Sequence, residues 1–161
     1  SRGLGDVYKR QDKEAINNAI EQISQFFVSD DVTKFLKKKT QLYTLFSVVF
    51  YMQRNKIGVT AENLQNLESF VELYAVFDND MDLTGNITDT EKKLFDWLKK
   101  YKLASSEGLN KHTNRMIRFN VMKDFLFGLD EELREAIKPL LSKMQAEREK
   151  MPLEPIENTV E

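Results

Sequence analysis

A polar interval in the middle of the chain carries oxygen-bearing side chains at the spacing of a calcium loop. Between Asp80 and Glu91, such side chains occupy positions 1, 3, 5, 9 and 12 of that loop, and Gly85 occupies position 6. Carboxylate and hydroxyl oxygens suit a hard cation such as Ca²⁺. The alternative is an ordinary polar loop, in which Glu91 forms the capping box of the next helix with Thr88. The predicted metal ligands are Asp80, Asp82, Thr84 and Glu91.

Two groups of basic residues are candidates for contact with the phosphates of DNA. Arg115 and Arg118 are three residues apart on an expected helix, directly after Lys111 and His112. Guanidinium and ammonium groups at this spacing bind phosphate oxygens, although they serve equally well to pair with acidic residues of a packed neighbour. The run 37–39 is either a second phosphate contact or a solvated helix end. The predicted nucleic-acid contacts are Lys111, Arg115, Arg118, Lys37, Lys38 and Lys39.

The sequence contains no arrangement of residues that is typical of catalysis. It has no cysteine and a single histidine, His112, so neither a thiol nucleophile nor a histidine-based metal site is expected. Nucleophile motifs such as Gly-x-Ser-x-Gly and glycine-rich phosphate loops are missing as well. We therefore expect no catalytic residue and no cofactor in this chain.

The apolar residues that must build a scaffold for these groups recur every three or four positions, which predicts helices. Hydrophobic residues make up 41% of the 161 residues and only three are proline, a composition typical of a folded helical domain. We expect an all-α fold, an irregular bundle of about six or seven helices. Expected helices cover about 13–28, 32–36, 40–52, 60–77, 88–101 and 113–127, and a last one starts at Asp130 and kinks or restarts at Pro139.

The net charge of −2 argues against a basic footprint over the whole domain, although a local basic stripe is compatible with it. No apolar run approaches the roughly 20 residues that span a bilayer. The lack of cysteine fits a reducing compartment. We therefore expect a cytoplasmic protein with no membrane partner.

Residues 1–11 read Ser-Arg-Gly-Leu-Gly-Asp-Val-Tyr-Lys-Arg-Gln, which resembles a translated sequencing adapter. On this interpretation the native chain of a metagenomic fragment starts near Asp12, and its net charge is nearer −4. We expect a helical domain over 12–150, the C-terminal part of a larger protein, and a flexible tail over 151–161. A missing upstream domain would leave apolar surface exposed on the first helix, near Ile16, Ile20 and Phe27.

Two segments, 35–46 and 104–119, resemble the C-terminal helical half of GmrSD-type proteins. The first, Phe-Leu-Lys-Lys-Lys-Thr-Gln-Leu-Tyr-Thr-Leu-Phe, is similar to the family pattern KKT-x-hydrophobic-Tyr-x-Leu-Phe. The second, which begins Ala-Ser-Ser-Glu-Gly and ends Arg-Met-Ile-Arg-Phe, is similar to a later pattern, small-Ser-x-Gly, Asn, then Arg-x-x-Arg. The resemblance covers about two thirds of the chain after residue 11.

The resemblance implies a bacterial restriction system that acts on phage DNA. It also implies an upstream ParB-like domain in the same chain, with an Asp-Gly-Gln-Gln-Arg motif and nucleotide and divalent-metal chemistry, and a nuclease domain or subunit as partner. Neither the Asp-Gly-Gln-Gln-Arg motif nor a nuclease motif occurs in this chain. The full-length protein would then be the NTP-dependent restriction endonuclease, and this fragment its helical accessory part. DNA would be a further partner. The alternatives are a calcium-binding module and a plain protein-interaction bundle.

Overall fold

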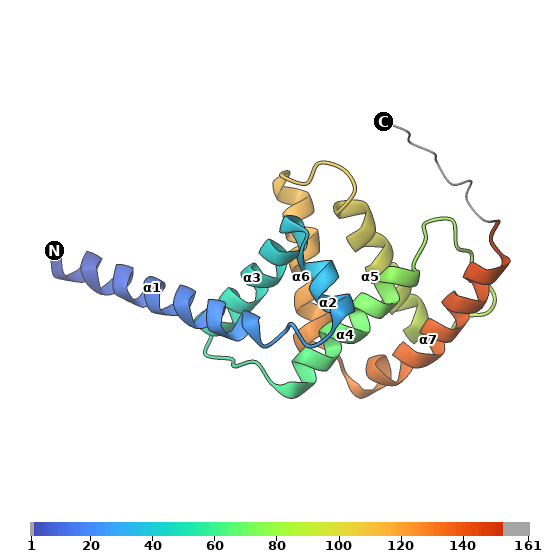
Figure 1. The fold of residues 1–161 in the computed structure, drawn as a ribbon, viewed down its shortest axis with the longest axis horizontal. Coiled ribbons are helices and arrows are strands. Elements are labelled where there is room, and N and C mark those ends of the chain that lie inside the picture. The colour runs from blue at the N-terminus through green and yellow to red at the C-terminus, as the bar shows by residue number, and fades with distance from the viewer. Residues whose placement is uncertain (1, 153–161) are drawn as a thin grey trace.

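The structure, a computed structural model, describes residues 2–152 and consists of helices joined by loops (Figure 1). Within that range there are seven helices and no strand, so the predicted all-α class is confirmed. The tail predicted at 151–161 lies, from residue 153 onward, outside the described residues. The helices are α1 (Arg2–Ser24), α2 (Asp30–Leu36), α3 (Lys39–Arg54), α4 (Ala61–Val76), α5 (Asp89–Ala104), α6 (His112–Phe127) and α7 (Glu131–Lys150).

Three helix starts were predicted correctly because their capping side chains are visible in the sequence. Thr60 and Thr88 each accept a hydrogen bond from the amide three residues later, and both form complete capping boxes. Asp130 caps α7 by accepting from the amide of Leu133. Gly128 ends α6, as expected.

Several helix boundaries differ from the prediction, including the end of α1 at Ser24 and the start of α2 at Asp30. Helix α1 begins at Arg2 rather than near Lys13, so it runs without interruption across the expected adapter boundary. Helix α3 begins before Thr40, the residue expected to cap it, and α6 begins one residue earlier than expected; their N-cap residues are Lys38 and Lys111. Helix α7 continues through Pro139 to Lys150 instead of restarting there.

The core forms around α4, which lies in the middle of the molecule (Figure 1). The ring of Phe70 is completely buried and contacts the rings of Phe35, Tyr74, Tyr101 and Phe125 at centroid distances of 5.0 to 6.0 Å. These rings come from α2, α4, α5 and α6, and edge-to-face contacts dominate among them. One aromatic cluster therefore joins four helices.

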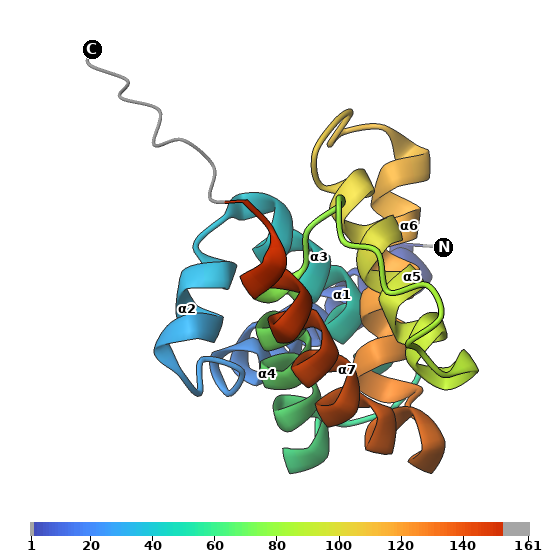
Figure 2. The same cartoon turned by 90° about the vertical axis from the view of Figure 1, so that its right-hand side faces the viewer.

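Helices α3, α6 and α5 lie side by side in that order, with α6 between its two neighbours. Helix α7 packs against α4 and α5 (Figure 2). The carboxylate of Glu91 on α5, which is 3% exposed, pairs with the ammonium of Lys143 on α7 and fixes this contact. No helix in the described part of the chain has the length and apolar character needed to cross a bilayer.

Candidate nucleic-acid interface

Arg118, one of the predicted DNA contacts, lies inside the protein, where it is 4% exposed. Its guanidinium donates to the carbonyls of Ala104 and Leu109, at 2.5 and 2.8 Å, and to the hydroxyl of Thr44 at 3.4 Å. A buried guanidinium that serves three protein acceptors is not presented to a phosphate. The prediction that Arg118 contacts DNA is therefore corrected: this side chain positions its neighbours.

A second buried hydrogen bond lies beside Arg118. The phenol of Tyr101 on α5 donates to the side-chain carbonyl of Gln41 on α3. Burial raises the pKa of Tyr101, and the nearby Tyr74 adds to this effect, while Thr44 and Arg118 oppose it. The phenol therefore stays protonated and remains a donor. The two segments that carry the family resemblance, 35–46 and 104–119, are joined directly by the Thr44–Arg118 contact, and Gln41 of the first segment accepts from Tyr101, three residues before the second.

The loop between α5 and α6 is fixed by two side chains of α6. Arg118 holds the carbonyls at 104 and 109, and the amide of Asn114 donates to the carbonyls of Glu107 and Gly108 at 2.9 and 3.1 Å. Gly108 has a φ of 57°, the left-handed conformation that glycine adopts without strain. The loop therefore delivers Lys111 to the start of α6 in a defined position.

The remaining predicted contacts are exposed, and they gather where α3 and α6 begin (Figure 1). Lys37, Lys38 and Lys39 precede or open α3, and Lys111 and Arg115 lie at the start of α6. The two helices run in the same direction, because Thr44 contacts Arg118 and, farther along both helices, the Tyr51 ring contacts Lys123. The structure thus brings both predicted basic groups, except Arg118, to one end of the bundle.

A hollow of about 290 Å³ lies between the outer faces of α3 and α6. Its walls include Tyr43 and Ser47 from α3 and Arg115 and Phe119 from α6. Arg118 also lines it, although this residue is 4% exposed and its guanidinium serves protein acceptors. Tyr43 is 64% exposed, although tyrosine usually buries most of its ring. The sequence analysis missed Tyr43, and the signal for it is an aromatic residue on the polar side of a helix.

Positive charge is concentrated in the two chain segments that build this surface. Segment 32–61 contains six Lys or Arg residues and no acidic residue, and segment 97–123 contains seven with Glu107 as the single acid. Two of these cations are engaged elsewhere, since Arg54 pairs with Asp12 and Arg118 is buried. The other residues of the chain hold 11 basic and 25 acidic side chains. A chain of net charge −2 therefore separates its charges, and the α3, α6 and distal α5 surfaces form what we call the basic face.

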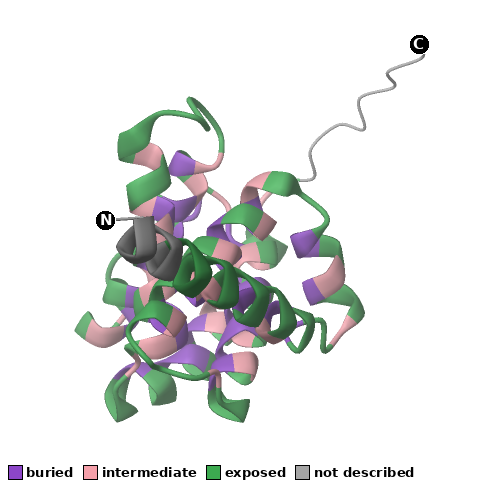
Figure 3. Ribbon diagram, turned by 90° about the vertical axis from the view of Figure 1, so that its left-hand side faces the viewer, coloured by how far each residue is buried: buried purple, intermediate pink, exposed green. Residues whose placement is uncertain are grey.

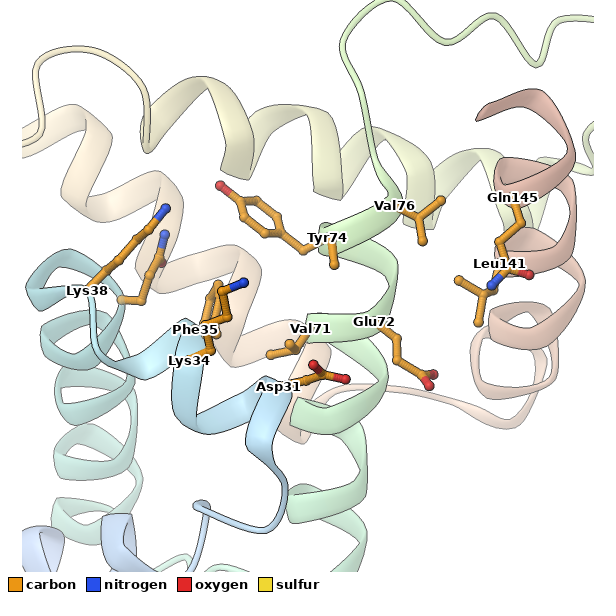
Figure 4. Close-up of a pocket in the computed structure, with 12 residues that line it drawn as sticks. Asp31, Lys34, Phe35, Lys38, Val71, Glu72, Tyr74, Val76, Leu141 and Gln145 are labelled. Carbon is orange, nitrogen blue, oxygen red and sulfur yellow. The ribbon is translucent and has the colours of Figure 1, made fainter. Parts of the chain in front are cut away.

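A second groove, of about 450 Å³, lies between α2, α4 and α7 (Figure 4). Phe35, Val71, Tyr74 and Leu141 give it an apolar floor. Lys38 lies at one end of this groove, whereas Lys37 and Lys39 do not line it.

The four predicted calcium ligands are not gathered in one place. Both oxygens of the Glu91 carboxylate contact the ammonium of Lys143, and one also accepts from the amide of Thr88. Asp82 is exposed and accepts from the amide of Thr84 at 2.9 Å. Within residues 9–152, no three acidic or histidine side chains are close enough to hold a metal ion together. Glu91 therefore performs the capping role that was the alternative prediction.

Much of α1 is exposed (Figure 3). Apolar side chains are among its exposed residues and among those just after its end, as expected from the sequence. Ile16 and Ile20 lie one turn apart on the outer side of the helix, and Phe27 and Val28 follow its end. Ala19 and Ile23, in contrast, are buried against the bundle. The predicted exposure near Ile16, Ile20 and Phe27 is confirmed.

The chain matches no known family profile, no curated protein and no solved structure. The resemblance to GmrSD-type proteins therefore remains a prediction from two short segments. The two segments are neighbours in space, because Arg118 of the second donates to the hydroxyl of Thr44 in the first.

Proposed function

We propose that this chain is a helical accessory module of a DNA restriction protein and that it contacts DNA through its basic face. The separation of charge is the observation that carries the DNA contact. Two segments that fold next to each other hold thirteen basic residues and one acid, and ten of the basic residues remain when the paired Arg54, the buried Arg118 and Lys38 at the second groove are left out. They create a local positive potential on a protein of net negative charge. Polyanion binding depends on such a local surface rather than on the total charge.

The exposed cations of the basic face belong to packed helices and to a loop held by hydrogen bonds. Lys39 and Arg115 belong to helices that pack against each other, and Lys111 follows a loop that Arg118 and Asn114 hold. Cations held in place this way contact phosphates without first losing conformational freedom. The restriction assignment itself rests on the family resemblance, and the missing ParB-like domain would supply the chemistry.

The exposed apolar residues of α1 support the accessory role. Ile16 and Ile20 lie outside the core, where a docked domain of the same protein would cover them. We propose that the upstream domain is that partner. Recovery of the upstream coding sequence tests this assignment, and a reading frame without Asp-Gly-Gln-Gln-Arg would remove it.

The test of the DNA contact is binding to a labelled duplex at several salt concentrations. We expect Arg115→Ala and Lys111→Ala each to weaken binding and to lower the slope of log affinity against log salt by about 1. Lys138→Ala is the matched control, because Lys138 is an exposed lysine of α7 outside the basic face. Equal slopes for all three variants and the parent protein would favour a plain protein-interaction bundle.

A further inference from the structure

The outer side of α3 carries a row of exposed residues spaced four apart. The row consists of Lys39, Tyr43, Ser47 and Tyr51. Tyr43 is 64% and Tyr51 45% exposed, so neither ring is needed to complete the core. A helix that serves only to pack would normally place polar residues at these positions.

A matching row lies on α6, directly beside the first. It consists of Lys111, Arg115, Phe119 and Lys123, also four apart. The ring of Phe119 meets the ring of Tyr51 edge to face at 5.5 Å. The ammonium of Lys123 lies 5.5 Å from the Tyr51 ring and 5.6 Å from the Phe119 ring. The two rows therefore form one surface, which we call the α3–α6 strip.

The strip alternates cations with aromatic rings along two parallel helices. Lys39, Lys111 and Arg115 stand near its start, Tyr43 overlooks the hollow between the rows, and Tyr51 lies beyond it. Phosphates bind cations, and the flat faces of unpaired bases stack on aromatic rings. A duplex hides its base faces inside the stack and offers only groove edges and phosphates. Exposed tyrosine rings therefore have no base face to stack on in a duplex.

From this alternation we infer that the α3–α6 strip binds an unpaired nucleic-acid strand, with Tyr43 and Tyr51 stacking on bases while Lys39, Lys111 and Arg115 contact phosphates. This inference rests on the proposed function and specifies the form of DNA that it contacts. Eight residues of helix separate the two tyrosines by about 12 Å. They would therefore stack on bases that are not adjacent in the strand.

The experiment measures fluorescence anisotropy of labelled oligo(dT) and of a duplex of the same length, titrated with the parent protein and its variants. We expect the parent protein to bind oligo(dT) more tightly than the duplex. Tyr43→Ala should weaken oligo(dT) binding about 5- to 150-fold, the loss expected for one stacked base. Tyr43→Phe keeps the ring and should restore most of the affinity. Because the Tyr43 ring is exposed, these variants should fold normally, and circular dichroism checks this.

Phe27→Ala is the matched control, since Phe27 is 43% exposed but lies outside the strip, and it should leave binding unchanged. Oligo(U) distinguishes RNA from DNA as the source of the strand, and binding of either supports the inference. Tighter binding to the duplex, or full affinity of Tyr43→Ala for oligo(dT), would overturn the inference. If duplex binding still falls in Arg115→Ala, the proposed function survives that result. No binding to any probe would remove both.

Discussion

The replacement Arg118→Met tests whether the buried guanidinium holds the α5–α6 loop. Methionine keeps the unbranched stem as far as the position of Nε but lacks the guanidinium, so the carbonyls of Ala104 and Leu109 and the hydroxyl of Thr44 lose their partner. Ala104 is buried, and its carbonyl finds no water, whereas Leu109 is 39% exposed and its carbonyl becomes hydrated. The Ala104 carbonyl thus bears the full cost, whereas the buried Thr44 hydroxyl loses Arg118 but still donates to the carbonyl of Thr40 at 2.7 Å.

A hydrogen bond to a charged donor contributes about 1.5 to 3 kcal/mol, and a buried acceptor left without a partner costs about 1 to 3 kcal/mol. Removing the buried charge of Arg118 returns part of this free energy, because its desolvation cost disappears. We expect Arg118→Met to lower the free energy of unfolding by about 2 to 4 kcal/mol. For a domain of this size that corresponds to a melting temperature roughly 4 to 16 °C lower.

The assay is thermal unfolding followed by circular dichroism, with amide hydrogen exchange of residues 105–111 as a local measurement. Arg115→Met is the matched control, since Arg115 is exposed on the same helix and its replacement should change stability by less than about 0.5 kcal/mol. Arg118→Lys keeps the charge but cannot span two carbonyls, so it should also destabilise the protein. If Arg118→Met melts with the parent protein and the loop amides exchange no faster, the structural role assigned to Arg118 is refuted.

Three further predictions concern the surroundings of this site. Burial raises the pKa of Glu91, but the hydrogen bonds from Lys143 and Thr88 and the charge of Lys143 outweigh it, so the pKa lies below its ordinary value of 4.5. The carboxylate therefore stabilises the fold above that value, and urea midpoints should fall more steeply below pH 4.5 in the parent protein than in Glu91→Gln. Tyr101→Phe leaves the side-chain carbonyl of Gln41 without its donor and should cost about 1 to 2 kcal/mol in urea unfolding, with an unchanged m-value. Gly108→Ala places an L side chain at a φ of 57° and should lower the free energy of unfolding by about 1 kcal/mol, measured the same way, whereas Gly58→Ala, at a position with open space around it, should not.

The sequence was sufficient to predict the helices, because their signals are local. Apolar residues every three or four positions mark the buried faces, and Thr60, Thr88 and Asp130 mark three starts by their capping oxygens. Helices α3 and α6 start earlier than expected because Lys38 and Lys111, their N-cap residues, make no capping hydrogen bond from the side chain. A lysine at that position carries no sequence signal for a helix start.

The position of Arg118 was not predictable from spacing alone. Three residues on a helix separate Arg115 and Arg118 by about 60° around the axis, so the two side chains are neighbours yet lie on different sides of the core boundary. Which side faces inward depends on α3 and α5, and these helices contribute Thr44 and the Ala104 carbonyl from distant parts of the chain. Such acceptors become visible only when the chain is folded.

The charge asymmetry was hidden for a similar reason. The net charge of −2 argued against nucleic-acid binding by the domain as a whole. Only the contacts of α6 with both α3 and α5 show that the two basic segments share a surface. The exposure of Tyr43 and Tyr51 could have been suspected from their four-residue spacing with Lys39 and Ser47. Neither tyrosine was predicted as a contact, because apolar residues cover most of the circumference of this helix.

The anchoring of three separate chain segments by one guanidinium also has a mechanical consequence. Thr44, the end of α5 and the α5–α6 loop are all fastened to Arg118, so a pull on the loop is transmitted to α3 through that side chain. A ligand that displaced the loop would therefore have to strain α3 as well. We expect the α5–α6 loop and α3 to move together as one rigid unit.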